Sequence, residues 1–255
     1  MSFEACARLV ERGDPLRFRA AMAVPVEARR VLFPLYAFNL EVARAPWVTK
    51  EPMIAEMRLQ WWRDVLVEVA AGGPVRTHEV TDALAPVLDS QGARDLDVLV
   101  EVRRWDIYAD AFADRDHLDR YIAGTSGALM GTAARLLGPC DPDVVADFAY
   151  GSGVANFLRA IPALENAGRR PLVDGTVEGV RDLAADALAR LDRARGRHRE
   201  VSRLAGAALV AGWQARPVLQ RAVRDPQAVA LGALEPAPFG DRVRLLRAAT
   251  LGWWR

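Results

Sequence analysis

The sequence contains little lysine, little cysteine and no long hydrophobic run. Lys50 is the one lysine among 34 basic residues, an arginine bias typical of coding in a GC-rich genome. Cys6 and Cys140 are the only cysteines, too few for a disulfide framework or a zinc site, which indicates buried thiols in a reducing compartment. The longest apolar stretches, 31–40 and 204–213, reach about half of the roughly 20 residues that a membrane-spanning helix needs.

An excess of either charge is also missing, because 34 basic residues face 33 acidic ones. Binding to a nucleic-acid backbone needs surplus positive charge, so no nucleic-acid partner is expected. The N-terminus carries Glu4 and Glu11 and lacks the apolar core of a secretory signal. The expected location is therefore cytoplasmic, with peripheral contact to the inner membrane left open. Gly-rich phosphate loops, nucleophile elbows and metal-histidine motifs are missing, and no catalytic residue is assigned.

What the sequence does contain is a succession of long segments with helical periodicity. Apolar residues recur every three or four positions between prolines and glycines, which predicts an all-α protein. The chain has 255 residues, 51% of them hydrophobic, without a repeat or a low-complexity linker, so a single domain over 1–255 is expected. Helices are expected at 26–45, 52–71, 81–89, 93–112, 115–137, 142–163, 177–204, 204–224 and 241–254.

Tryptophan pairs occur in one predicted helix and at the C-terminal end. Adjacent helical residues point about 100° apart, so Trp61 is favoured for the core while Trp62 stays open. Trp253 and Trp254 fit a docked last helix and a contact with a membrane or partner equally well. The expected buried stripe of the segment 52–71 consists of Ile54, Met57, Trp61, Val65 and Leu66.

Three passages together carry a resemblance to a known family. Residues 17–43 contain the run Leu-Tyr-Ala-Phe, residues 121–130 read YIAGTSGALM, and residues 151–173 contain Asn-Phe-Leu-Arg. In this order they resemble the squalene/phytoene synthase family, the all-α enzymes that join two prenyl diphosphates head to head. The resemblance is strongest over 15–205 and implies a single-domain, isoprenoid-synthase-like helical bundle around a central pocket.

That resemblance also implies two magnesium-binding motifs on facing helices. Magnesium prefers oxygen ligands, and each motif of the family carries aspartates about four residues apart on one helical face. This chain has no acid at the corresponding positions, so the metal ligands are interpreted as lost and no cofactor is expected. Magnesium would be needed only by an active enzyme. The lost metal-ligand positions are Ala43, Arg44, Trp47, Ala160 and Leu164.

The second motif has a further irregularity, because Pro162 lies within its helix. Proline removes a backbone donor and clashes with the preceding turn, so Pro162 is expected to kink or end this helix.

Three polar positions correspond to residues that face the pocket in the enzymes: Tyr121, Asn156 and Arg159. If the pocket persists, Arg159 is the candidate to hold an anionic head group through paired hydrogen bonds. The alternative is that Arg159 pairs with an acid such as Glu41 and joins two helices.

The altered motifs resemble a non-catalytic branch of the family more closely than its enzymes. The strings LYAFNLEVA, MRLQWWRDVL and LRAIP, followed by Arg169-Arg170, are similar to respiratory complex I assembly proteins. This implies complex I subunits or assembly intermediates as partners and no catalysis. Two alternatives stay open: a head-to-head prenyltransferase that uses farnesyl or geranylgeranyl diphosphate with atypical ligands, and a non-catalytic binder of a prenyl lipid or quinone.

Overall fold

A computed structural model of the chain describes residues 2–108 and 110–254. No strand forms among these residues, and one isolated bridge joins Cys140 to Val201. The all-α prediction is confirmed. The elements are α1 Ser2–Gly13, α2 Pro15–Ala23, α3 Val26–Arg44, α4 Pro52–Ala71, α5 Thr81–Leu84, α6 Ser90–Val102, α7 Trp105–Tyr108, α8 Arg115–Ile122, the π-helical turn η1 Ala123–Gly127, α9 Ala128–Leu137, α10 Pro142–Asn166, α11 Val177–Gly196, the 3-10 turns η2 His198–Glu200 and η3 Val210–Gly212, α12 Gly206–Leu209, α13 Ala215–Arg224, α14 Gln227–Ala230 and α15 Pro238–Leu251.

Local sequence signals set where the long helices begin and end. Pro52 and Pro142 occupy first turns, where the missing N–H has no intrahelical partner to lose. Gly72 ends α4 with a φ of 67°, a left-handed conformation that glycine adopts without strain. Side-chain oxygens that cap helix N-termini come from Asp14, Asp89, Asp114, Asp141 and Thr176.

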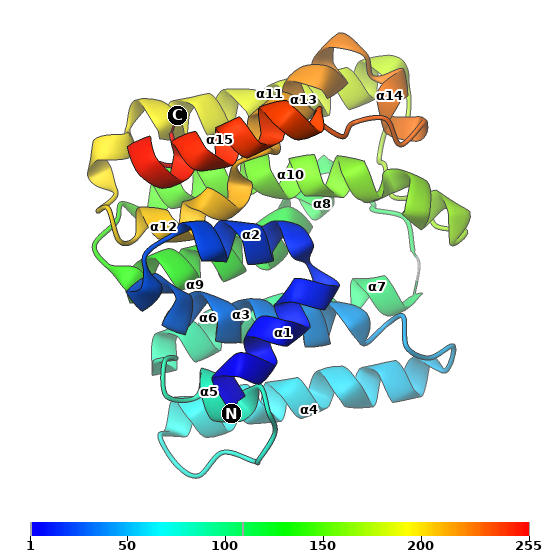
Figure 1. Ribbon diagram of the computed structural model, residues 1–255. Helices are drawn as coiled ribbons and strands as arrows, with labels where there is room; N and C mark the ends of the chain where they lie inside the picture. The colour runs from blue at the N-terminus through cyan, green and yellow to red at the C-terminus, as the bar shows by residue number, and fades with distance from the viewer. Residues whose placement is uncertain (1, 109, 255) are drawn as a thin grey trace.

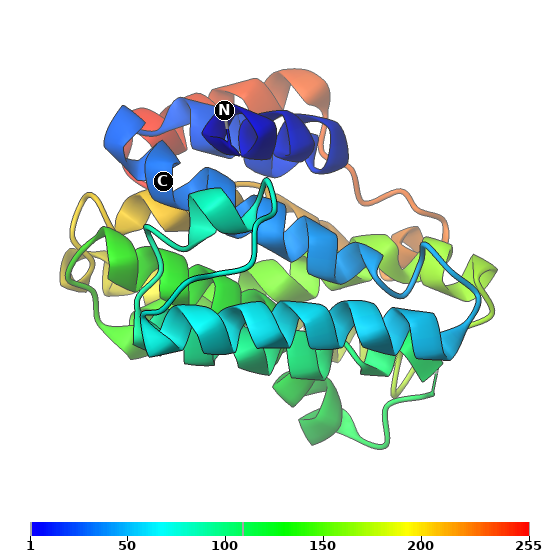
Figure 2. The ribbon, with the colours of Figure 1, turned by 90° about the horizontal axis from the view of Figure 1, so that it is seen from below.

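The helices stack around α3, α9 and α10. Figure 1 shows α4 at one edge of the bundle and α11 and α13 at the opposite edge, with α3 and α10 between them. In Figure 2, seen from below, α1, α2 and α15 lie on one side of the molecule and α8 lies on the other. α10 is buried along most of its length and packs against α11 and α13, so it forms the central wall of the fold.

The buried face of α4 differs from the expected one. Trp62 is buried and meets Phe38 edge-on, with ring centroids 5.3 Å apart, whereas Trp61 is only partly buried. Ile54 and Met57 are exposed, so their assignment to the stripe was wrong. α4 packs mainly on α6, and that contact, rather than the local pattern, selects the buried face. The residues that α4 buries are Ala55, Leu59, Trp62, Val65, Leu66 and Val69.

The helix predicted over 93–112 is broken in two. α6 ends at Val102 and α7 starts at Trp105, because the chain turns at Arg103 and Arg104. In this turn Arg103 Nη1 donates to Asp106 Oδ2 at 2.8 Å, and the backbone N–H of Asp106 donates to the carbonyl of Arg103. The break brings Arg103, Trp105 and Asp106 to the wall of a cavity.

Of the two outcomes predicted for Pro162, a kink or an end of its helix, the end is wrong. α10 continues to Asn166, and the backbone N–H groups of Ala167 and Arg169 donate to Leu164 and close the last turn. α14 packs on α10, so tertiary contacts help to hold the segment after the proline.

The C-terminal tryptophans dock onto the bundle. Trp253 is buried with its ring centroid 4.8 Å from that of Phe148, and Trp254 stacks on His198 at 4.4 Å. Of the two interpretations left open, the structure favours the docked last helix. Among the described residues, no helix is both long enough and apolar enough to cross a membrane.

Candidate functional site

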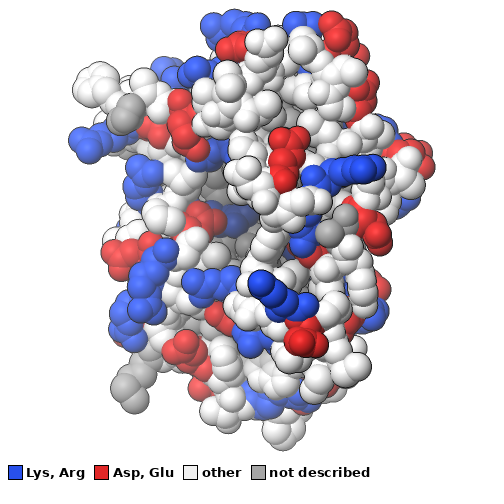
Figure 3. Space-filling view, turned by 90° about the vertical axis from the view of Figure 1, so that its right-hand side faces the viewer, with Lys and Arg blue, Asp and Glu red and all other residues white. Residues whose placement is uncertain are grey.

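A cavity of about 260 Å³ opens between the C-terminal parts of α3 and α10. Its other walls come from α7, from the end of α8 and from η1. Figure 3 shows the end of the bundle where α3 and α10 finish, and basic and acidic side chains are interspersed over this face. The surface around the cavity is therefore not dominated by one sign of charge.

Most of the residues that the sequence singled out meet at this cavity. Ala43 and Trp47 approach from α3 and the turn after it, and Ala160 and Leu164 approach from α10. Tyr121 and Asn156 also line the cavity. The structure thus brings to one place four of the five positions that the family resemblance predicts to correspond to metal ligands.

Arg44 is the position that lies outside this group. Its side chain is exposed, and its guanidinium stands 3.9 Å from the carboxylate of Glu41. Arg58 stands at the same distance from Glu41, so this carboxylate lies near two cations.

Arg159 does not line the cavity, and its acidic partner is not Glu41. Its Nε donates to Glu235 at 2.9 Å and its Nη1 donates to Gln214 at 3.0 Å. Arg159 therefore ties α10 to the segment just before α13 and to the loop before α15. The expectation that Arg159 joins two elements fits these contacts, but the expected acid was wrong, because Glu41 lies near Arg44 and Arg58 instead.

A hydrogen-bonded triad lies at the inner wall. Arg103 Nη1 donates both to Asp106 at 2.8 Å and to the Tyr121 hydroxyl at 2.8 Å, and that hydroxyl donates to Asp106 at 2.9 Å. Burial raises the pKa of Tyr121 and keeps the phenol protonated as a donor. Burial acts to lower the pKa of Arg103, but Tyr121 and Asp106 outweigh it and raise that pKa.

A second arginine covers the cavity from the loop after α10. Arg169 is 8% exposed, and its guanidinium carbon lies 4.6 Å from the ring centroid of Trp47 and 6.0 Å from that of Trp105. One of its nitrogens donates to the backbone carbonyl of Asp106. A guanidinium between indole rings gains cation–π attraction, which is stronger when the cation is desolvated. A fixed positive charge therefore stands next to Trp47.

Aromatic rings fill the space beside the triad. Trp105 stacks on Phe112 with centroids 4.0 Å apart, and Phe157 meets Phe112 edge-on at 6.0 Å. Tyr121 contacts both Phe112 and Phe157. The cavity is consequently a short recess with a packed aromatic wall.

The side chains of this cavity do not fit a magnesium site. Among the described residues that line it, Asp106 is the one carboxylate, and Arg103 and Tyr121 already bond to its oxygens. Magnesium needs oxygen ligands in near-octahedral geometry, which alanine, leucine and tryptophan side chains cannot supply. Over the described part of the chain, no group of three or more His, Cys, Asp or Glu residues could hold a metal ion.

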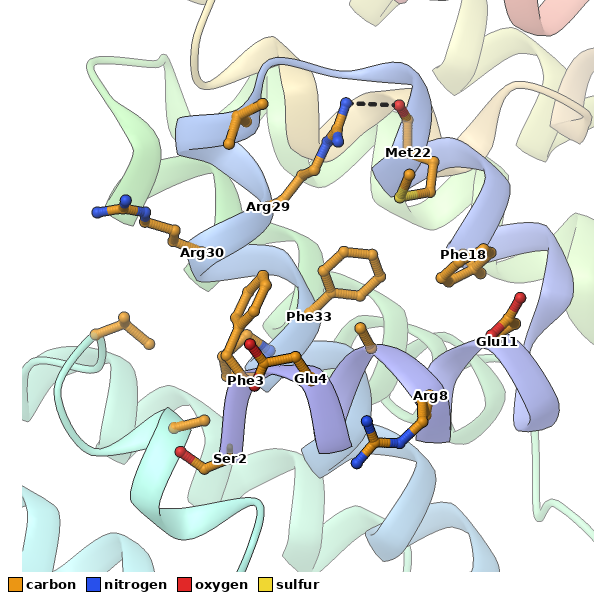
Figure 4. Close-up of a pocket in the computed structure, with 15 residues that line it drawn as sticks. Ser2, Phe3, Glu4, Arg8, Glu11, Phe18, Met22, Arg29, Arg30 and Phe33 are labelled. Atoms are coloured by element: carbon orange, nitrogen blue, oxygen red, sulfur yellow. Dashed lines mark hydrogen bonds between the residues drawn. The ribbon is translucent and has the colours of Figure 1, made fainter.

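A second hollow, of about 770 Å³, lies between α1, α2 and α3. Figure 4 shows Phe3, Phe18 and Phe33 lying in it, and Phe33 stands 5.8 Å from Phe3 and 5.7 Å from Phe18 by ring centroids. Arg29 donates to the carbonyl of Met22 at 2.8 Å. This hollow gathers apolar side chains, whereas the polar chemistry gathers at the cavity.

Sequence reasoning missed Arg103, Trp105 and Asp106 as cavity residues, and it missed Arg169, which contacts Trp47 and Trp105 beside them. The signal was present in the run Arg-Arg-Trp-Asp at 103–106, which places three charges together inside a segment assigned to one helix.

Known proteins resemble this chain both in sequence and in fold. A sequence profile described as squalene/phytoene synthase matches residues 10–249. A crystal structure of a dehydrosqualene synthase superposes with a TM-score of 0.81 at 16% identity, over 98% of this chain and 95% of that one. Squalene synthase HpnC from Alicyclobacillus acidocaldarius superposes with a TM-score of 0.72 at 19% identity, over 89% and 94%. The predicted isoprenoid-synthase-like fold is confirmed.

Among curated proteins, the chain is similar to assembly factors. A Drosophila melanogaster homolog of NADH dehydrogenase (ubiquinone) complex I, assembly factor 6, is 30% identical over 175 residues, which are 65% of this chain and 51% of that protein. The Homo sapiens assembly factor 6 is 25% identical over 163 residues, or 62% and 48%. The chain spans about half the length of these relatives. Since the family profile covers nearly all of the sequence, the chain belongs to the squalene/phytoene synthase family.

Proposed function

We propose that this protein is a non-catalytic member of its family and acts as a binding or assembly protein for respiratory complex I. Its partners in this proposal are complex I subunits or assembly intermediates, and its single domain covers residues 1–255. The observation that carries the proposal is the chemistry of the cavity, which is lined by Ala43, Trp47, Ala160 and Leu164. The family resemblance implies carboxylate ligands at these four positions.

Ionisation of a prenyl diphosphate explains why these positions matter. The leaving diphosphate is a dense anion, and hard magnesium ions must neutralise it as it departs. Apolar side chains at the four positions offer no ligand for such ions. Arg169 supplies one fixed cation near Trp47, which is less charge than two or three divalent ions would bring.

The size of the cavity supports the same proposal. Sites for drug-sized ligands measure roughly 300–1,000 Å³, and the cavity measures about 260 Å³. Two prenyl diphosphates, the substrates that the family's enzymes join, exceed that space. The aromatic packing of Trp105, Phe112 and Phe157 limits the depth that a prenyl chain could use.

The names of the curated relatives support the assembly part of the proposal, since they are called complex I assembly factors. We place the protein in the cytoplasm with peripheral contact to the inner membrane, because complex I is a membrane complex.

A turnover assay tests the non-catalytic role. Purified protein is incubated with Mg²⁺ and farnesyl or geranylgeranyl diphosphate, and released pyrophosphate is measured beside a dehydrosqualene synthase as positive control. We expect no release above the protein-free blank. Magnesium-dependent release would establish the enzyme alternative, and co-purified prenyl lipid or quinone in a native mass spectrum would favour the carrier alternative.

Restoring the acids tests how much else the cavity has lost. A variant with Ala43→Asp, Trp47→Asp, Ala160→Asp and Leu164→Asp should still lack efficient turnover, because the packed rings of Trp105, Phe112 and Phe157 still leave too little space for two prenyl chains. Removing Pro162 should add little, since Ala160 and Leu164 line the cavity on either side of it. Robust activity of the fourfold variant would contradict the size argument.

Partner capture tests the assembly role directly. The tagged full chain is recovered from cells and the bound proteins are identified, with the tag alone as control. Enrichment of complex I subunits or intermediates is the expected result. Their absence from material captured under mild cross-linking would count against the proposal.

A further inference from the structure

The outer face of α15 carries an apolar stripe that no other described element covers. Phe239, Val243 and Leu246 are 82%, 41% and 63% exposed. At about 100° per residue the three side chains fall within an arc of about 60°. They therefore form one continuous stripe, called here the α15 stripe, along the outside of the helix.

Two arginines flank the α15 stripe, one on each side. Arg242 and Arg247 are exposed and lie about 40° beyond the two edges of the stripe on the helical wheel. Within the described part of the chain, neither forms an ion pair, whereas Arg244 pairs with Asp241 at 3.5 Å. The acidic residue of this helix, Asp241, is buried on the inner face. The outer face is thus apolar at its centre and cationic at both edges.

The surroundings of Arg247 add to this positive field. The pKa of Arg195 is lowered, mainly by burial. The positive charges of Arg216 and Arg247 lower this pKa further, while the negative charge of Asp192 opposes the shift. Arg195 and Arg216 share the carboxylate of Asp192, at 3.3 Å and 3.0 Å, and Arg247 lies close enough to Arg195 for their charges to repel each other.

The inner face of α15 is fixed to the bundle, so the α15 stripe cannot turn inward. Gln214 donates to the buried carboxylate of Asp241, and Ala248 is buried. The helix also packs against α2. After it, Trp253 is held against Phe148. The stripe is a stable feature of the folded surface.

We propose that α15 lies on an anionic lipid surface, with Phe239, Val243 and Leu246 among the acyl chains and Arg242 and Arg247 at the phosphate headgroups. This inference deepens the peripheral location proposed above and names the surface responsible. A helix in the plane of a membrane has this arrangement, with apolar side chains on one face and basic residues beside them. Arginine can extend its charged end to the headgroups while its stem stays in apolar surroundings.

The charges favour a lipid surface over a protein partner. A protein partner would need acidic residues spaced to pair with both Arg242 and Arg247. Anionic lipid headgroups can pair with both arginines without such spacing, because the lipids move freely in the membrane. The neighbouring surface also suits a membrane. Figures 1 and 2 place α1 and α2 on the same side of the molecule as α15, and their hollow, shown in Figure 4, presents the exposed Phe3 and Met22.

Vesicle sedimentation tests the inference with the full chain. Vesicles of phosphatidylcholine alone are compared with vesicles of equal parts phosphatidylcholine and phosphatidylglycerol. We expect binding to the anionic vesicles that weakens with salt, and at least about tenfold weaker binding to the neutral ones. Leu246→Asp should reduce binding to the anionic vesicles by at least about tenfold, and R242E/R247E should do the same.

Matched controls separate the α15 stripe from general surface effects. Val67 on α4 is 66% exposed, so Val67→Asp introduces the same charge at a similar exposure. Arg120 lies on α8, on the opposite side in Figure 2, so Arg120→Glu controls for the charge change of each single reversal, Arg242→Glu and Arg247→Glu, which should each weaken binding. The two controls, Val67→Asp and Arg120→Glu, should bind vesicles like the parent chain. Circular dichroism verifies that each variant keeps its helix content.

Any of three results would overturn the inference. The first is a parent chain that fails to sediment with anionic vesicles, and the second is a Leu246→Asp variant that binds them as well as the parent does. The third is a dimer, detected by light scattering, that forms through the α15 stripe. If complex I partners are captured equally well by Leu246→Asp while vesicle binding is lost, the membrane surface stands and is separate from the assembly site. If the parent chain does not bind vesicles, the membrane inference fails, but the turnover and capture assays still test the proposed function separately.

Discussion

Single residues decide what the cavity can do. Trp47 stands where the family resemblance places an aspartate, and its ring holds the guanidinium of Arg169 at 4.6 Å. An aspartate at this position would bring an oxygen ligand, while tryptophan brings a flat apolar face that suits a planar cation. Where the family resemblance implies a metal ligand, this chain therefore has a contact between two of its own side chains.

At the same scale, the two tryptophans of α4 should differ in their effect on stability. Trp62 is buried against Phe38, so Trp62→Ala should lower the free energy of unfolding by about 3–5 kcal/mol through loss of apolar burial and a cavity. Trp61 is partly exposed, so Trp61→Ala should cost about 1–2 kcal/mol. Urea unfolding measures both. Equal losses would contradict the observed orientation of α4.

The ion pair of Asp89 should make the stability of the fold depend on pH in the acidic range. Its hydrogen bonds with Arg135, at 2.7 Å, are the main cause that lowers the pKa of Asp89 to about 2. Because the folded pKa lies below the ordinary value of 3.8, the ionised pair stabilises the fold above that value. The contribution is lost as the pH falls toward about 2.

Two substitutions separate the ion pair from the helix cap, since Asp89 also accepts the backbone N–H of Gly92. Asp89→Asn keeps a capping oxygen and should cost at most about 1 kcal/mol at neutral pH, as expected for an exposed pair. Asp89→Ala should cost about 1 kcal/mol more through loss of the cap. Thermal unfolding at several pH values checks this. A difference between parent and Asp89→Asn that persists below pH 2 would contradict it.

At the scale of the element, η1 shapes the wall of the cavity. Thr125 donates to the carbonyl of Tyr121 at 2.7 Å, and Ser126 donates across to the carbonyl of Ala149 on α10 at 3.0 Å. The π-helical turn thus fastens one helix to another beside the cavity, and such turns often occur at functional sites. The sequence predicts helix over 115–137 but has no signal for this change of hydrogen bonding.

Two helical glycines should respond in opposite ways to alanine. A Cβ at Gly131 in α9 would meet nothing within 4 Å, so Gly131→Ala should stabilise the protein by about 0.5–1 kcal/mol through helix propensity. A Cβ at Gly153 in α10 would lie 2.7 Å from both Ile122 and Ser126. Gly153→Ala should therefore destabilise the fold by about 1–3 kcal/mol. Chemical denaturation measures the free energy of unfolding of both variants. If both variants were more stable, or both less stable, than the parent chain, the predicted difference in space around the two glycines would be wrong.

At the scale of the whole molecule, metal should not contribute to stability. Among the described residues that line the cavity, Asp106 is the one carboxylate, and its oxygens accept hydrogen bonds from Arg103 and Tyr121. A ligand that binds only the folded state raises the unfolding midpoint by mass action. We expect the thermal midpoint to stay unchanged with Mg²⁺, with Mg²⁺ plus inorganic pyrophosphate, and after chelation. An upward shift of several degrees that requires both Mg²⁺ and pyrophosphate would indicate a metal-dependent site.

The sequence by itself determined the helical class, the family and the bounds of α4. These follow from local period, prolines, glycine caps and the order of motifs, which need no knowledge of distant contacts. Only the tertiary structure decided that Trp62 rather than Trp61 is buried, that Arg159 pairs with Glu235, and that Arg169 covers the cavity beside Trp47. The physical reason is that helical periodicity gives each residue an angle around its own helix axis, whereas the neighbour it meets depends on segments far away in the chain.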